Sequence, residues 1–181
     1  FYTKEEADAE AAKDGSTYVE DAGRGYRKVV PSPMPKEIVE KEAVRALVEA
    51  DVLTICSGGG GIPVVAEDGQ YVGVEAVNDK DFSARVLAEN VDADRLIILT
   101  GVDNIYINYN QPDQKALEQI SVAEAEEYIK EGHFAAGSML PKIEAALDFV
   151  KGDDKRKAII TSIENLENID KEAGTVISQK G

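Results

Sequence analysis

Apolar residues recur along most of this chain with the periods of amphipathic helices and buried strands. Residues 36–48 follow a helical period, whereas the apolar runs at 52–55 and 95–100 are typical of buried strands. Shorter runs predict strands at 105–107, 157–162 and 174–178, and a hairpin signal at 67–69 separates two more, at 63–65 and 71–77. Because strands that alternate with helices usually form a largely parallel sheet covered on both faces, we expect an α/β fold, a three-layer αβα sandwich.

Residues suited to cap helices precede four of the expected helices: Thr3, Asn78 or Asp79, Ser121 and Ser138. Glu6 and Glu124 add the second half of a capping box to two of them. The helix after Ser138 carries Pro141 in its first turn. We expect these helices to stop near Gly15, Asn90, Gly132 and Gly152.

The first 35 residues differ in pattern from the rest of the chain. Weak alternation from Tyr18 to Val30, around Asp21 to Gly25, predicts a hairpin. Three prolines after it predict a stiff extended connector, at positions 31, 33 and 35. We therefore divide the chain into a small appended segment with its connector, residues 1–35, and an α/β domain, residues 36–181.

The chain carries 20 basic and 35 acidic residues, which gives a net charge of −15. A field of that sign repels the phosphates of nucleic acids and anionic membrane surfaces, so we exclude both as partners. The acidity also serves solubility, and any anionic ligand must be held by local lysines, arginines or backbone N–H groups. Cys56 is the only cysteine, and no signal peptide or transmembrane run is visible, so we expect a cytoplasmic protein.

Four consecutive glycines follow the first expected strand of the α/β domain: Gly58, Gly59, Gly60 and Gly61. Such a loop can bring several N–H groups against an anion, or it can be only a flexible turn, and the glycines alone do not separate these interpretations. No Gly-Lys-Ser or Gly-Lys-Thr follows the loop, and no Gly-x-Gly-x-x-Gly stands at a strand end. The sequence therefore disfavours P-loop and dinucleotide-binding mechanisms.

Two lysines occupy the first turns of expected helices. Lys80 follows Asp79, and Lys142 follows Ser138 by four positions. Because the helix dipole disfavours a cation there, Lys80 needs either a neighbouring carboxylate, Asp79 or Asp81, or a bound anion, and Lys142 is in the same situation. A shared polyphosphate would account for both lysines, since lysines and Mg²⁺ stabilise the charge on a transferring phosphoryl group.

Two loops after strand ends are suited to hold a base and a ribose. One is Thr100-Gly101-Val102-Asp103, and the other runs from Tyr106 through Pro112-Asp113. Turn residues of this kind are also common where no ligand binds, so the loops support a nucleotide site only in combination with the lysines.

Taken together, these stretches resemble the carbamate kinases of the amino acid kinase superfamily. The resemblance runs over nearly the whole chain and is carried by residues 25–33, 58–64, 74–81, 99–103 and 133–146. It implies reversible phosphoryl transfer between ATP and carbamate, giving ADP and carbamoyl phosphate, as in arginine fermentation. It also implies ATP or ADP with Mg²⁺ as the nucleotide, small-molecule substrates and an amino acid kinase-like fold. We further expect a homodimer.

The resemblance assigns roles to individual residues. Lys80 and Lys142 would contact the phosphates, Asp81 would hold the lysines in place, and no protein ligand for a metal is expected. The loop from Gly58 to Gly61 would help to hold the phosphate or carbamate side. The nucleotide pocket would be lined by Gly101, Val102, Asp103, Tyr106, Pro112, Asp113 and Met139. Replacing either lysine by alanine in the complete enzyme is expected to cut turnover by orders of magnitude with little loss of folding stability.

The resemblance has one departure, at the front of the chain. Members of the family begin with a further large segment that carries glycine-rich loops for carbamate and the transferred phosphoryl group, whereas this chain opens at Phe1 without it. We therefore expect residues 1–35 to be the remainder of a protruding subdomain and the isolated chain to be inactive or severely impaired. Two alternatives stay open: a non-catalytic remnant that binds nucleotide or a partner, and another kinase of the superfamily acting on a carboxylate or a nucleotide.

Overall fold

The computed structural model describes residues 1–21 and 23–181, which form two compact units. The first unit combines Phe1–Met34 with Ile62–Asn78, and the second combines Pro35–Gly61 with Asp79–Gly181. Residues 62–78 were expected to belong to the larger domain. They group with the N-terminal segment instead, and a backbone hydrogen bond of 3.0 Å from Val77 N to Pro31 O joins the two stretches.

The first unit begins with α1 (Lys4–Asp14), whose predicted capping box is present and whose C-cap is the left-handed Gly15. The hairpin expected after it forms from β1 (Thr17–Glu20) and β2 (Tyr26–Val29), which pair antiparallel. Its predicted turn includes Ala22, which lies outside the described residues.

The second predicted hairpin of this unit pairs β3 (Val64–Glu67) with β4 (Gln70–Gly73). Asp68 and Gly69 form its turn with φ values of 48° and 78°, as a type I′ turn requires. The second strand ends at Gly73 rather than at Val77.

The larger unit is built on a four-stranded sheet in the order β5-β9-β10-β8. β5 (Arg95–Thr100) and β9 (Lys157–Ser162) have the predicted bounds and run parallel. β10 (Thr175–Ser178) pairs antiparallel with β9 and parallel with β8 (Gln119–Ser121), so two of the three pairings are parallel. β6 (Ile105–Ile107) pairs separately with β7 (Lys115–Leu117). Neither β7 nor β8 was predicted.

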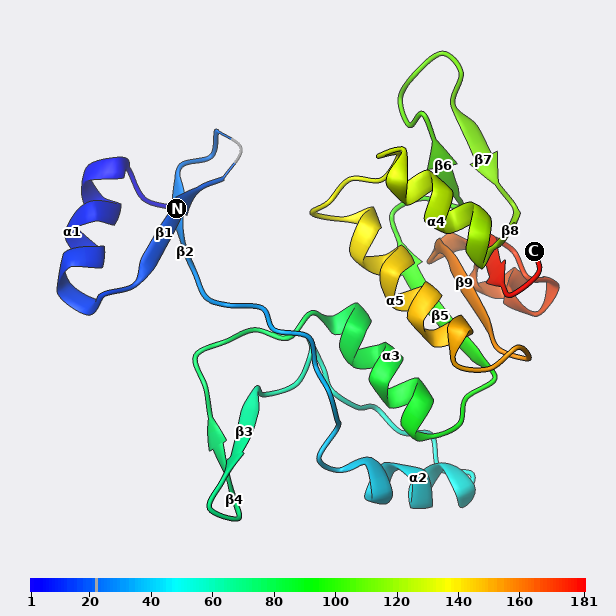
Figure 1. Ribbon diagram of the computed structural model, residues 1–181, viewed down its shortest axis with the longest axis horizontal. Coiled ribbons are helices and arrows are strands. Elements are labelled where there is room, and N and C mark those ends of the chain that lie inside the picture. The colour runs from blue at the N-terminus through cyan, green and yellow to red at the C-terminus, as the bar shows by residue number, and fades with distance from the viewer. Residues whose placement is uncertain (22) are drawn as a thin grey trace. The chain divides into compact units, whose positions relative to one another are not determined.

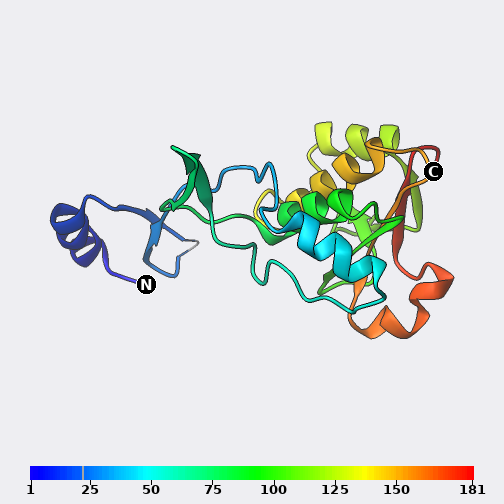
Figure 2. The ribbon, with the colours of Figure 1, turned by 90° about the horizontal axis from the view of Figure 1, so that it is seen from below.

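Four helices belong to the larger unit: α2 (Lys41–Glu49), α3 (Lys80–Asn90), α4 (Val122–Lys130) and α5 (Met139–Lys151). α3 and α5 lie side by side and both contact β5 (Figures 1 and 2). The fully buried side chains of Ile143 and Phe149 in α5 and of Ile160 in β9 belong to the core between these layers. On the opposite face of β5, Ile97 and Leu99 are 41% and 37% exposed.

Helix ends follow the sequence signals with one exception. Asp79 caps α3 by accepting a hydrogen bond from Asp81 N at 2.8 Å, and Ser121 and Glu124 form the predicted capping box of α4. Ser138 occupies the N-cap position of α5, but its side chain makes no capping hydrogen bond to the described residues. A 3₁₀ helix, η1 (Glu164–Lys171), follows β9 and was not predicted.

The strand predicted at 52–55 does not form. These residues belong to no helix or strand and pair with no strand of the described chain, and Leu53 and Ile55 are each 96% exposed. Cys56, which follows this run, is partly buried. A strand exists only through hydrogen bonds to a neighbour, and an apolar run predicts the strand without predicting that neighbour.

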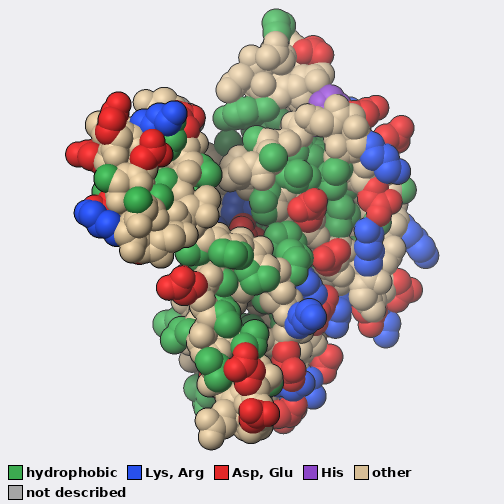
Figure 3. Space-filling view, turned by 60° about the vertical axis from the view of Figure 1, so that its left-hand side comes forward, with side chains coloured by type: hydrophobic (Ala, Val, Ile, Leu, Met, Phe, Trp, Pro, Cys, Tyr) green, Lys and Arg blue, Asp and Glu red, His purple; other side chains and the backbone are tan. Residues whose placement is uncertain are grey.

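Charged side chains of both signs are mixed over the face shown in Figure 3, although the chain as a whole has a net charge of −15. No helix among residues 1–21 and 23–181 is long and apolar enough to cross a membrane.

Candidate active site

Several elements of the larger unit meet at the carboxyl edge of β5 and β9. These strands are parallel neighbours, and their last residues, Thr100 and Ser162, face each other in the ladder. α3 leads into β5 and α5 leads into β9, so both helices begin at this same edge. Open α/β sheets commonly bind their ligands there.

A buried ion pair joins the first turns of the two helices. Lys142 Nζ in α5 donates a hydrogen bond of 2.7 Å to Asp81 Oδ2 in α3, and the two residues are only 9% and 7% exposed. Lys80 Nζ lies 3.8 Å from the same oxygen, but its side chain is 62% exposed. The geometry thus brings all three predicted catalytic residues together, with Asp81 between two ammonium groups.

The charges of this cluster decide what it can bind. One carboxylate and two ammonium groups leave a net positive charge, and the N-termini of α3 and α5 add the positive ends of their dipoles. Because Lys142 is already paired and Lys80 is not desolvated, an incoming anion meets the exposed Lys80 first. The cluster is therefore suited to an anionic ligand with several oxygens, such as a polyphosphate.

The glycine loop is held by hydrogen bonds of its own. Gly58 N donates to Cys56 O at 2.8 Å, and the N–H groups of Gly60 and Gly61 both donate to Ser57 O. The buried hydroxyl of Ser83 in α3 donates to Gly60 O at 2.8 Å and ties the loop to that helix. The N–H groups of three of the four glycines are thus hydrogen-bonded within the loop, and its role in binding a ligand stays a prediction.

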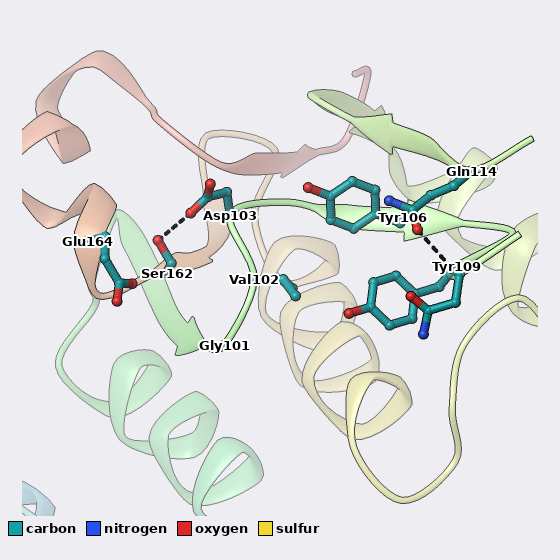
Figure 4. Close-up of a pocket in the computed structure, with 9 residues that line it drawn as sticks. Gly101, Val102, Asp103, Tyr106, Tyr109, Gln114, Ser162 and Glu164 are labelled. Carbon is teal, nitrogen blue, oxygen red and sulfur yellow. Dashed lines mark hydrogen bonds between the residues drawn. The ribbon is translucent and has the colours of Figure 1, made fainter. Parts of the chain in front are cut away.

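A cavity of about 540 Å³ opens at the carboxyl ends of β5 and β9, the same edge of the sheet at which α3 and α5 begin (Figure 4). Asp103 and Ser162 lie on one side of it and Tyr106 and Tyr109 on the other, with Val102 between them. The ring centroids of the two tyrosines are 5.8 Å apart with their planes tilted by 43°. The residues that line the cavity are Gly101, Val102, Asp103, Tyr106, Tyr109, Asn110, Gln114, Ser162 and Glu164.

Four of the seven predicted nucleotide-binding residues line this cavity: Gly101, Val102, Asp103 and Tyr106. The other three do not. Asp113 accepts a hydrogen bond of 2.6 Å from Asn108 in the β6–β7 loop, which also contains Pro112, and Met139 packs against the core at the start of α5.

Three residues that line the cavity were not predicted: Gln114, Ser162 and Glu164. Ser162 and Glu164 follow from the parallel pairing of β9 with β5, which places the end of one strand beside the end of the other. The predicted strand 157–162 carried that signal, because the carboxyl ends of parallel neighbours lie at one edge.

A model of the amino acid kinase family matches residues 5–162, and the chain belongs to this family. It is 55% identical to carbamate kinase 1 of Enterococcus faecium and 54% identical to a carbamate kinase of Lentilactobacillus hilgardii. Each match covers 99% of this chain and 57% of the relative.

A solved structure of carbamate kinase from Giardia lamblia, bound to AMP-PNP, superposes with a TM-score of 0.88 at 46% identity. That match covers 98% of this chain and 57% of the other. The chain therefore spans little more than half the length of the relatives it matches.

Proposed function

We propose that this chain is the part of a carbamate kinase that binds the nucleotide and its phosphates. The complete enzyme would transfer a phosphoryl group reversibly between ATP and carbamate. The observation that carries the proposal is the buried Lys142–Asp81 pair with Lys80 beside it, at the sheet edge next to the cavity. The identity of 55% to a carbamate kinase supports this substrate rather than that of another kinase of the family.

The transfer needs fixed cations and no general base. A carbamate oxygen attacks the γ-phosphorus of ATP, a new P–O bond forms, and the bond from that phosphorus to the bridging oxygen breaks, so ADP leaves with the electron pair. Carbamate is already an anion, and no proton moves in this step. Lys80 and Lys142 stabilise the phosphoryl oxygens, while Asp81 keeps the Lys142 ammonium at the edge of the sheet.

The nucleotide brings Mg²⁺ with it in this proposal. Among the residues that the structure describes, no group of three or more His, Cys, Asp or Glu side chains is placed to hold a metal ion. Mg²⁺ keeps several waters and binds readily to phosphate oxygens, so the phosphates themselves are its natural ligands here.

The isolated 181-residue chain is expected to be severely impaired. It spans 57% of the length of the Enterococcus faecium relative, and its apolar residues Leu53 and Ile55 have no cover among the described residues. Nucleotide binding is expected to persist because the cavity and the lysine cluster lie in one compact unit.

The test is to measure ATP formation from ADP and carbamoyl phosphate in a coupled assay. The isolated chain is compared with a chimera in which it replaces the matching 57% of the Enterococcus faecium enzyme. We expect the chimera to be active and the isolated chain to be at or near background. A folded chimera without activity would overturn the proposal, and full activity of the isolated chain would contradict its impairment.

Three further predictions belong to the same proposal: a homodimer, a cytoplasmic location and a role in arginine fermentation. Light scattering of the purified chimera tests the first of these. A monomer at micromolar concentration would contradict it.

A further inference from the structure

The glycine loop, Gly58 to Gly61, has a shape that local hydrogen bonds fix. Gly60 N and Gly61 N both donate to Ser57 O, at 2.8 and 2.6 Å. The turn places four residues at positive φ, with values of 59°, 45°, 133° and 82°: Ser57, Gly58, Gly60 and Gly61. Because these bonds join residues at most four positions apart, they set the shape of the loop but not its place in the larger unit.

A single side chain joins this loop to the rest of the larger unit. Ser83 Oγ donates to Gly60 O at 2.8 Å across 23 positions of sequence, and both residues are buried. Within residues 1–21 and 23–181, no other hydrogen bond or ion pair links positions 57–61 to a residue beyond Cys56. The run at 52–55 before the loop pairs with no described strand, so no ladder holds the loop from that side.

The Ser83 hydroxyl makes an unusual choice of partner for a helical serine. Such a hydroxyl often donates to the carbonyl four positions earlier, which here is Asp79 O, the acceptor for Ser83 N at 3.0 Å. It reaches Gly60 O instead. Only 1% of Ser83 is exposed, so water is no substitute, and without the hydroxyl the buried Gly60 carbonyl would lose its one donor among the described residues.

This bond places the loop beside the exposed lysine of the cluster. Ser83 follows Lys80 by three positions in α3, so the two side chains leave neighbouring points on one face of the helix. Gly59 is exposed, and its N–H makes no hydrogen bond within the part of the chain that the structure describes. An unpaired N–H near an ammonium group is suited to a phosphate oxygen as long as the loop keeps its place.

We propose that Ser83 is a positioning residue, which holds the glycine loop next to Lys80 so that the loop and the lysine bind the phosphate of carbamoyl phosphate together. Ser83 does not touch this substrate and acts only through Gly60. The proposal rests on the proposed function for the identity of the substrate. It implies that a change at Ser83 weakens the binding of carbamoyl phosphate and spares the nucleoside, whose cavity lies elsewhere along the sheet edge.

The size of the effect follows from the charge of the ligand. A hydrogen bond to a charged group is worth about ten- to a hundredfold in affinity. Ser83→Ala displaces the loop but leaves its N–H groups and Lys80 in the protein, so we expect the lower end of this range, about tenfold.

The test is steady-state kinetics of the active chimera, with carbamoyl phosphate and ADP varied separately. Ser83→Ala should raise the KM for carbamoyl phosphate about tenfold and change the KM for ADP and kcat by less than about twofold. Ser83→Thr keeps the hydroxyl and should restore most of the lost affinity. A purely structural role would lower the amount of folded enzyme, which moves neither KM.

Ser121→Ala is the matched control, because it also removes a serine hydroxyl that bonds to the backbone of the larger unit, at the start of α4. It should leave both KM values unchanged, and urea unfolding verifies that each variant is folded. A second measurement uses the isolated chain, titrated calorimetrically with inorganic pyrophosphate. Ser83→Ala should weaken this binding about tenfold, and Ser121→Ala should not change it.

Several results would overturn the inference: an unchanged KM for carbamoyl phosphate in Ser83→Ala, an equal rise of both KM values, or no recovery in Ser83→Thr. If the chimera is folded but inactive, the pyrophosphate titration decides alone. Pyrophosphate affinity that depends on Ser83 would then sink the proposed function and leave the role of Ser83 standing. Pyrophosphate binding that is undetectable or independent of Ser83 would refute that role.

Discussion

At the scale of single residues, the two lysines at helix N-termini differ more than the sequence suggested. Both were expected to be replaceable by alanine with little loss of folding stability. The structure places the Lys142 ammonium 2.7 Å from Asp81 with only 11% of its side chain exposed, whereas 62% of the Lys80 side chain is exposed. A buried ion pair that loses one partner leaves an uncompensated charge, so the expectation changes for Lys142 and holds for Lys80.

The substitutions Lys80→Met and Lys142→Met separate the effect of each lysine on turnover from its effect on stability. Both should lower the turnover of the chimera by about 10²–10³-fold, because each removes a cation from the transferring group. Lys142→Met should also lower the free energy of unfolding by about 3–5 kcal/mol, because it leaves the buried Asp81 carboxylate without its partner. Lys80→Met should change the free energy of unfolding by less than about 0.5 kcal/mol. Steady-state kinetics and urea unfolding measure the two quantities.

A double variant, Asp81→Leu with Lys142→Met, is the control for this pair. Replacing both charges by apolar groups should restore most of the lost stability but none of the turnover. Wild-type stability in Lys142→Met alone would mean that the pair is hydrated in solution.

At the scale of elements, the sequence predicted where helices begin better than which segments form paired strands. Thr3 and Ser121 cap their helices as predicted, because a capping box depends only on residues three positions apart. β7 and β8 were missed, since each has only three residues and neither carries a long apolar run. The run at 52–55 was predicted as a strand and is not one, because no neighbour in the described chain pairs with it.

The Ser121 cap provides a prediction with a defined dependence on pH. Ser121→Ala should lower the unfolding free energy by about 1 kcal/mol at pH 7, and Ser121→Thr should lower it by less. The side-chain hydrogen bond from Ser121, followed by its backbone N–H, lowers the pKa of Glu124 below its ordinary value of 4.5. The contribution of this carboxylate is therefore fully present above pH 4.5 and is lost as pH falls through the lowered pKa.

The difference between the wild type and Ser121→Ala should accordingly shrink in acid. Urea unfolding at pH 7 and at pH values below 4.5 measures it. A difference that grows on acidification would contradict the capping-box role of Glu124.

At the scale of the whole molecule, the larger unit exposes apolar side chains on two segments, the run around Leu53 and one face of β5. Leu53 and Ile55 are each 96% exposed, and Ile97 and Leu99 of β5 are partly exposed as well. Exposed apolar surface of this kind promotes self-association, and β5 is also an edge strand of its sheet.

The double variant Leu53→Gln with Ile55→Gln tests whether this segment drives association of the isolated chain. Because both side chains already face solvent, the unfolding free energy should change by less than about 0.5 kcal/mol while light scattering falls. Ile98→Gln, at a residue that is 4% exposed in the same unit, is the contrasting control and should be strongly destabilising. A loss of more than about 2 kcal/mol in the double variant would show that the segment is buried in solution.

The sequence by itself determined the local features of this protein: the bounds of β5 and β9, the capped helix starts, and two lysines placed against the helix dipole. Only the tertiary structure decided which groups meet. Asp81 accepts a hydrogen bond from Lys142, 61 positions away, while its neighbour Lys80 lies 3.8 Å from the same oxygen. Ser162 donates a hydrogen bond to Asp103, 59 positions away. The physical reason is that periodicity and capping act over a few residues, whereas these contacts depend on the order in which strands pair and helices pack.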